Sequence, residues 1–96
     1  MQSDFDRLQL SQMKSLIGLL QKRQVGISKF VSDQWSLVEM LQEIDTHWKV
    51  DYFSLVNEIE DLYAAAVDQG KKEMDQKDIQ TIDKVLEKML ILIESQ

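Results

Sequence analysis

Apolar side chains recur every three or four residues in four separate segments of this chain, and its 96 residues include no proline. This spacing places the apolar side chains of each segment on one face of an α-helix. A proline inside a helix would cost ~3 kcal/mol, so its absence leaves the helices uninterrupted. The dipeptides Asn-Gly and Asp-Gly, typical of β-hairpin turns, are also missing. The sequence therefore predicts an all-α protein, and its length predicts one domain over residues 1–96.

Helical segments are predicted over four ranges, which are residues 6–23, 28–44, 51–70 and 75 onward. Ser28, Asp51 and Asp75 have side chains that suit the N-terminal cap of a helix. Gly70 suits the positive φ that often ends one. A short connection is then left at residues 45–50, and it carries His47, Trp48 and Lys49. Because short connections make consecutive helices antiparallel neighbours, we expect an antiparallel four-helix bundle.

Composition and charge exclude several classes of function. The chain has no cysteine, which excludes disulfides, thiolate metal sites and thiol catalysis. Its longest apolar run covers residues 89–93 and is far shorter than the ~20 residues of a membrane-spanning helix. The N-terminus lacks the basic and apolar regions of a signal peptide, so we expect a cytoplasmic location. A net charge of −6 argues against direct binding to nucleic acid or to an anionic membrane.

Negative charge is concentrated in the middle of the chain. Residues 30–70 hold nine acids and one base, Lys49, whereas residues 1–29 hold two acids and five bases. Residues 71–96 are close to balance, with six acids and five bases. Like charges without partners reduce stability, so this concentration suggests a binding surface for a basic partner. A charged helix face opposite an apolar stripe is also typical of a surface that contacts only solvent.

Helical phase selects the residues of this predicted surface. Five acids fall opposite the apolar stripes of the second and third predicted helices, namely Glu39, Glu43, Glu58, Asp61 and Asp68. Three aromatic residues lie off the stripes near these acids, namely Trp35, Trp48 and Phe53. Aromatic side chains are frequent anchors of protein interfaces. We therefore predict that these eight residues form one partner-binding surface, although Trp48 would also suit the end of the core.

Two patterns bear on enzymatic activity. His47 is the only histidine and has no serine, cysteine or second histidine arranged with it for catalysis or metal binding. Glu58 and Asp61 form a Glu-x-x-Asp pair, which resembles half of the Mg²⁺ site of all-α nucleotide pyrophosphohydrolases. The other half needs Glu-x-x-Glu on the preceding helix, but Glu39 and Glu43 are four residues apart. We therefore expect no enzymatic activity, no cofactor and no metal, with a Mg²⁺-dependent pyrophosphohydrolase as the alternative.

The segment Gly26-Ile27-Ser28-Lys29-Phe30, followed by Trp35 and Leu37, resembles the start of the second helix in colicin-D-type immunity proteins. Chain length, acidity and helical pattern are also similar to those of this family and of helical immunity proteins from contact-dependent inhibition systems. The resemblance implies a bacterial protein that binds a cognate toxin, often a tRNA-cleaving nuclease, and blocks its basic active-site cleft. An acidic helical face would then take the place of RNA in that cleft. A helical adaptor or regulator with the same surface and another partner is the second alternative.

Overall fold

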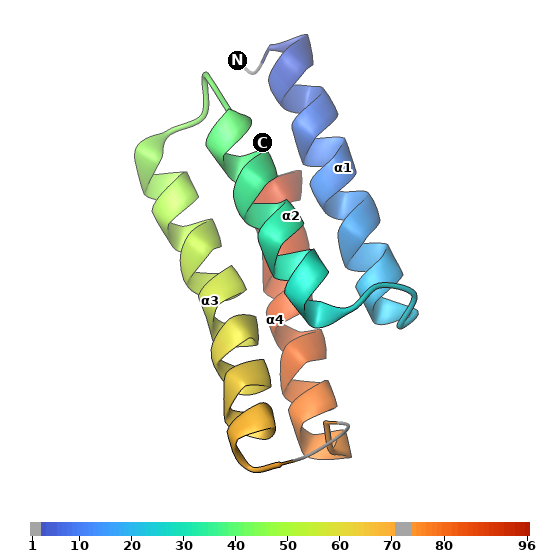
Figure 1. Ribbon diagram of the computed structural model, residues 1–96. Coiled ribbons are helices and arrows are strands. Elements are labelled where there is room, and N and C mark those ends of the chain that lie inside the picture. Colours follow the sequence, from blue (N-terminus) through green and yellow to red (C-terminus); the bar gives the residue numbers. More distant parts are fainter. Residues whose placement is uncertain (1–2, 71–73) are drawn as a thin grey trace.

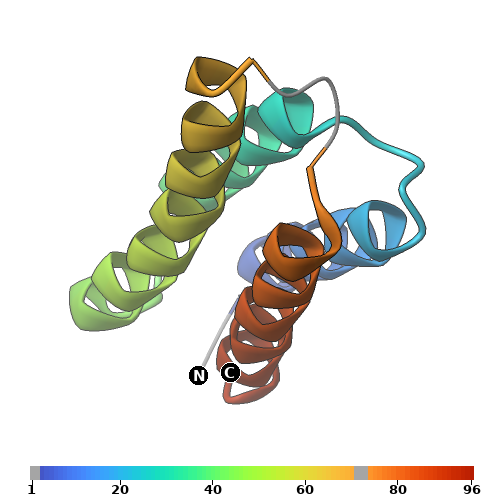
Figure 2. The same ribbon diagram turned by 90° about the horizontal axis from the view of Figure 1, so that it is seen from below.

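The computed structural model describes residues 3–70 and 74–96, and within them every regular element is an α-helix. The helices are α1 (Asp4–Gln21), α2 (Ile27–Met40), α3 (Thr46–Asp68) and α4 (Gln76–Glu94). They run alternately down and up, so consecutive helices are antiparallel neighbours (Figure 1). Helix α1 also contacts α4, and the four helices surround a common interior (Figure 2). The predicted all-α fold, an antiparallel four-helix bundle, is therefore confirmed.

All four helices contribute apolar side chains to a single core. Met13 of α1, Phe30 of α2, Tyr52 of α3 and Leu86 of α4 are fully buried in it. Isolated helices of this length are marginal in water, so this shared core is what holds them in place. In the part of the chain that the structure describes, no helix is long and apolar enough to cross a membrane.

Side chains that accept hydrogen bonds from backbone N–H groups fix where three of the helices begin. Ser3 caps α1, Asp45 caps α3 and the predicted cap Asp75 caps α4, with distances of 3.1, 2.8 and 2.9 Å. Ser28 is not a cap, contrary to prediction, because α2 begins one residue before it, after a glycine. Gly70 has the predicted positive φ, 73°, two residues beyond the last residue of α3.

The start of α3 corrects a second prediction. The sequence predicts that residues 45–50 connect two helices and that Asp51 caps the second, but α3 begins at Thr46. His47, Trp48 and Lys49 therefore lie in its first turn rather than in a loop. The additional turn is stabilised by packing, because the Trp48 ring stacks on the ring of Tyr52 with centroids 5.1 Å apart. As a result α3 is 23 residues long.

The preceding helix is shorter than predicted. It ends at Met40 rather than Ile44, because Leu41 adopts extended backbone angles. Leu41 and Ile44 are nevertheless buried, so their side chains pack in the core although they lie in the connection between α2 and α3. The ammonium group of Lys49 donates a 2.8 Å hydrogen bond to the Leu41 carbonyl oxygen, which ties the connection to the first turn of α3.

A buried polar network joins three of the helices. The Gln34 side chain of α2 donates from Nε2 to the carbonyl oxygen of Met13 in α1 at 3.0 Å. Its Oε1 atom accepts a 2.6 Å hydrogen bond from the phenol of Tyr52 in α3. Gln34 and Tyr52 are both fully buried, and leaving such groups unpaired would cost ~1–3 kcal/mol each. The network thus satisfies two buried polar side chains while it links α1, α2 and α3.

Burial raises the pKa of the Tyr52 phenol well above its ordinary value. The unfolded chain ionises this phenol near pH ~10, so above that pH it releases a proton that the folded chain keeps. We therefore expect Tyr52 to lower the free energy of unfolding by about 1.4 kcal/mol per pH unit above pH ~10. Urea unfolding on both sides of this pH measures the effect. Tyr52→Phe should remove this contribution, whereas Tyr63→Phe at a 37% exposed position should retain it.

A second buried polar contact joins α1 to the connection between α2 and α3. Asp6 is fully buried, although it lies in the first turn of α1. Its two carboxylate oxygens accept hydrogen bonds from the backbone N–H groups of Gln42 and Glu43, at 2.8 and 2.7 Å. Hydrogen bonds to an ionised acceptor are roughly twice as strong as neutral ones. Asp6 therefore fixes the path of this connection against the first turn of α1.

Candidate partner-binding groove

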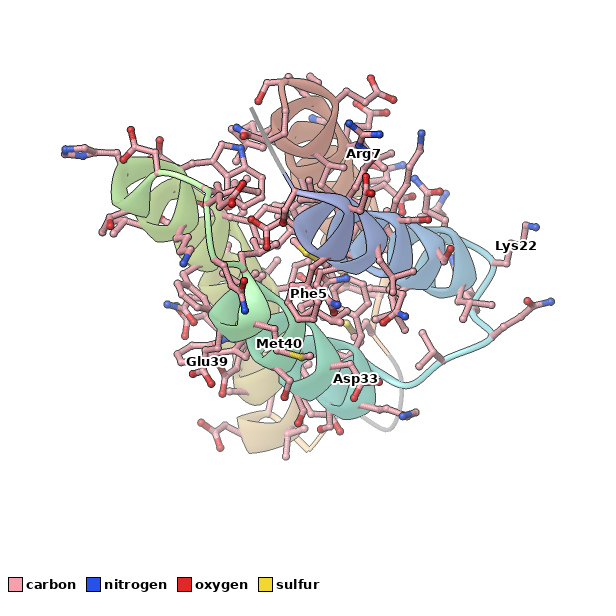
Figure 3. The ribbon with its side chains drawn as sticks, turned by 90° about the horizontal axis from the view of Figure 1, so that it is seen from above. Phe5, Arg7, Lys22, Asp33, Glu39 and Met40 are labelled. Atoms are coloured by element: carbon pink, nitrogen blue, oxygen red, sulfur yellow. The ribbon has the colours of Figure 1, made fainter. Side chains whose placement is uncertain are left out.

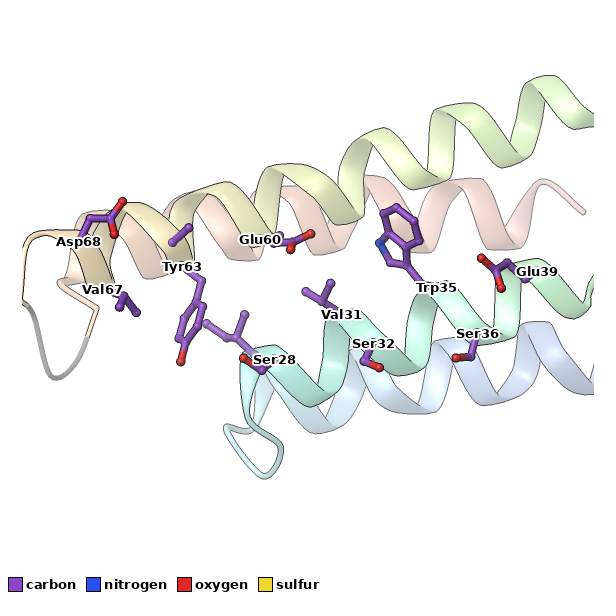
Figure 4. A pocket seen from close by; sticks show the side chains of 12 residues that line it. Ser28, Val31, Ser32, Trp35, Ser36, Glu39, Glu60, Tyr63, Val67 and Asp68 are labelled. Carbon is purple, nitrogen blue, oxygen red and sulfur yellow. The ribbon is translucent and has the colours of Figure 1, made fainter.

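A groove of about 680 Å³ runs between α2 and α3 and is open to solvent. Its lining extends from Ile27 to Glu39 on α2 and from Glu60 to Asp68 on α3. Each helix contributes side chains at three- and four-residue spacing, so the lining on each side comes from one helix face. Figure 4 shows these side chains following the two helices. We call this feature the α2–α3 groove.

Apolar side chains form much of the lining of the α2–α3 groove. They include Val31 and Trp35 from α2, and Tyr63, Ala64 and Val67 from α3. Trp35 and Tyr63 are each 37% exposed, and Val67 is 52% exposed. The Trp35 ring contacts the ring of Phe53 on α3, with centroids 4.9 Å apart and planes inclined by 49°. This contact holds the indole between the two helices and leaves part of it open to solvent.

Three carboxylates line the α2–α3 groove, and no described Lys or Arg does. Figure 4 shows Asp68 towards one end, Glu60 near the middle and Glu39 towards the other end. None of the three forms an ion pair with a base within residues 3–70 and 74–96. The bases of α2 and α3 are engaged elsewhere, since Lys29 pairs with an aspartate at 2.9 Å and Lys49 donates to a backbone carbonyl. The groove therefore presents negative charge beside exposed apolar surface.

The groove brings together only part of the predicted surface. Three of the predicted residues line it, namely Trp35, Glu39 and Asp68. Phe53 is half-buried and supports the Trp35 ring. Three other predicted acids are exposed but are not among the lining residues, namely Glu43, Glu58 and Asp61. The five predicted acids thus do not share one groove.

Glu60 lines the groove but was not among the predicted residues. Its signal in the sequence is spacing, because Tyr63, Ala64 and Val67 follow it by three, four and seven residues. Residues at these intervals share one helix face. The prediction selected acids opposite the apolar stripe, whereas the groove uses the flank of α3 that faces α2.

Trp48 requires a correction. Its side chain is 7% exposed and stacks on Tyr52, so it does not lie off the apolar stripe as predicted. Its indole Nε1 donates a 2.9 Å hydrogen bond to the carbonyl oxygen of Leu92 in α4. Trp48 is therefore part of the core, where it joins the start of α3 to the end of α4.

The described acids and the histidine lie apart from one another on the bundle. Among the residues that the structure describes, no three His, Asp or Glu side chains lie close enough together to hold a metal ion. Glu58 and Asp61 are exposed on α3, and His47 is exposed in the first turn of the same helix.

A second hollow, between α1 and α2, differs in chemistry. It encloses about 440 Å³ and is lined largely by leucine, serine and glutamine side chains. Asp33 is the one charged residue in its described lining, and this carboxylate pairs with Lys29 at 2.9 Å. Figure 3 shows Glu39 pointing away from α1, and thus away from this hollow. Of these two hollows, the α2–α3 groove is the one that complements a basic partner.

Comparisons of this chain with protein-family models, with curated proteins and with solved structures find no match. The geometry and the charge of the α2–α3 groove therefore bear most directly on function.

Proposed function

We propose that this protein is a non-enzymatic inhibitor that binds a basic protein partner through the α2–α3 groove. The observation that carries the proposal is the combination of exposed aromatic surface with three carboxylates that have no described basic partner. A toxin that cleaves RNA is the partner implied by the resemblance to colicin-D-type immunity proteins. The proposed mechanism is occlusion of that toxin's active-site cleft.

Charge explains why a nuclease suits this groove. A nuclease must attract phosphate groups, so its cleft is lined with Lys and Arg. Glu39, Glu60 and Asp68 would pair with those bases in place of RNA. Opposite fields also raise association rates, up to roughly 10⁸–10⁹ M⁻¹s⁻¹ at low salt. Fast association suits a protein that must neutralise a toxin before the toxin acts.

The aromatic residues supply the other part of the interaction. Binding energy in protein interfaces concentrates in a few large side chains at the centre of the contact, Trp and Tyr above all. Trp35 and Tyr63 lie within the groove and are each 37% exposed, so a partner can bury the remainder of both rings. The attraction between the surrounding carboxylates and the bases of the partner would then increase, because the partner excludes water from around them.

Reversing two groove charges tests the proposal. The partner is captured from the native host on immobilised protein, identified, and then titrated by calorimetry. We expect Glu39→Lys/Glu60→Lys to weaken its binding by about 100-fold, because placing like charges opposite each other costs several kcal/mol. The matched control is Glu58→Lys/Asp61→Lys, which changes the net charge equally on the same bundle but outside the groove. We expect the control to weaken binding less than about 5-fold.

Two outcomes would contradict this assignment. An equal loss of affinity in both double variants would mean that overall charge, and not the groove, attracts the partner. Capture of a partner without a basic surface would contradict the charge argument itself.

A separate assay distinguishes an inhibitor from an adaptor: one equivalent of this protein should stop RNA cleavage by the bound partner. Full activity of the partner in the complex would leave an adaptor and overturn inhibition.

A further inference from the structure

We infer that the α2–α3 groove accepts an amphipathic α-helix of its partner, with apolar residues on one face and Lys or Arg beside them. This inference rests on the proposed function and specifies the form of the partner segment. It follows from four properties of the groove, which are the state of its backbone, its length, its small side chains and the spacing of its carboxylates.

The backbone of the groove argues against an extended segment. Both sides are continuous α-helices, α2 and α3, whose central N–H and C=O groups are already paired within each helix. No sheet edge is available along these helices to pair with an incoming strand. An extended segment buried here would leave many of its own backbone groups unpaired, which is strongly unfavourable. A helix carries its backbone hydrogen bonds with it and avoids this penalty.

The length of the groove matches a short helix. Its α2 side extends from Ile27 to Glu39, which at ~1.5 Å per residue is roughly 18 Å. A helix of about three turns has the same length. Such a helix presents three or four apolar side chains at positions i, i+3 or i+4, and i+7 on one face. These are the anchors by which helices bind in grooves on other proteins.

Small side chains allow such a helix to approach closely. Ser28, Ser32 and Ser36 line the groove at four-residue intervals on α2, and Ala64 lines it on α3. Short side chains along a contact let two helix axes come within roughly 8 Å of each other. The larger Trp35 and Tyr63 side chains lie within the same lining and offer apolar contact to the incoming helix.

The carboxylates then specify the charge of the helix. Asp68, Glu60 and Glu39 are distributed from one end of the groove to the other (Figure 4). Glu60 and Asp68 are eight residues apart on α3, roughly 12 Å along its axis, so a helix in the groove would meet carboxylates about two turns apart. Lys or Arg side chains flanking its apolar face would pair with them, and their long aliphatic stems would cover the apolar lining.

Selection from a library of random peptides of about 14 residues, roughly four helical turns, tests the inference. The immobilised bait is the full chain, and the affinity of the enriched peptides is then measured for the full chain and for Ser32→Trp, which fills the groove at an exposed position. We expect the enriched peptides to share apolar residues at three- and four-residue spacing together with Lys or Arg. Ser32→Trp should weaken their binding by about 30-fold or more, and a proline at the centre of the peptide should do the same. Ser11→Trp on the exposed face of α1 is the matched control and should leave binding unchanged.

The possible failures separate the two proposals. Basic peptides with alternating apolar residues that tolerate the central proline would overturn the helical form but leave the proposed function standing. Helical peptides that lack Lys and Arg, and that bind Glu39→Lys/Glu60→Lys equally well, would overturn the basic partner instead. Peptides that are insensitive to Ser32→Trp would overturn both, provided that circular dichroism shows the variant folded. Val67→Gln, at a 52% exposed position in the groove, removes apolar contact without adding charge and provides a second variant with an expected loss of affinity.

Discussion

We expect Trp48→Ala to lower the free energy of unfolding by about 4 kcal/mol, a typical cost for removing a buried tryptophan. The substitution removes a side chain that is 7% exposed, its stacking on Tyr52 and its 2.9 Å hydrogen bond to Leu92. The substitution would leave a cavity where the start of α3 meets the end of α4, so side chains of both helices would lose packing contacts. Urea unfolding followed by far-ultraviolet circular dichroism measures the change.

The other tryptophan provides the control. Trp35→Ala removes a 37% exposed ring and one aromatic contact with Phe53, so we expect a cost of only about 1 kcal/mol. Its larger effect should be on binding of the partner, because Trp35 lines the α2–α3 groove. Equal destabilisation by the two substitutions would contradict the distinction between a core tryptophan and a groove tryptophan.

Asp6→Ala should lower the free energy of unfolding by about 3 kcal/mol, because two hydrogen bonds to a buried carboxylate are lost together. The N–H groups of Gln42 and Glu43, which now donate to Asp6 at 2.8 and 2.7 Å, would lose this acceptor. A loss of about 3 kcal/mol corresponds to a decrease in melting temperature of roughly 12–24 °C for a domain of this size. Differential scanning calorimetry measures both quantities.

Asp4 is the matched control for Asp6, since it carries the same charge in the same first turn of α1. Its side chain is fully exposed and its pairing with Arg7 is long, at 3.9 Å. We expect Asp4→Ala to change the free energy of unfolding far less than Asp6→Ala, because solvent screens a charge at a fully exposed position near a helix N-terminus. Similar costs for the two substitutions would show that Asp6 acts through the helix dipole and not through the connection between α2 and α3.

Local sequence signals were sufficient to predict the helices but not all of their ends. Apolar spacing and the absence of proline identified four helices, and Gly70 and Asp75 marked two of their ends correctly. Local signals place the start of α3 about one turn and a half too late, because Asp51 resembles a cap and Asp45 falls within the predicted connection. The Asp45 cap and the stacking of Trp48 on Tyr52 support the earlier start from nearby, and a third contact joins Trp48 to Leu92, which is 44 positions away. No local pattern carries such a contact.

The candidate site was harder to predict for a related reason. Helical phase shows which residues oppose an apolar stripe, but not which flank of a helix faces its neighbour. Trp35 and Trp48 both lay beside the acids in the sequence, and only the packed bundle separates the exposed ring from the buried one. Glu60 and Glu58 are two residues apart on α3, yet only Glu60 lines the groove. The side on which α2 packs against α3 determines that Glu60, and not Glu58, lines the groove.

The buried network of Gln34 also determines the register of the helices. Apolar stripes alone would tolerate a shift of one helix along another by a turn, about 5.4 Å, at modest cost. With Gln34 paired to both Met13 and Tyr52, such a shift would separate the partners inside the core and leave their polar atoms unpaired. The same shift would move Glu60 and Tyr63 along the groove relative to Trp35 and Glu39. The internal hydrogen bonds thus align the groove residues that face solvent, although none of the three bonded residues belongs to the groove.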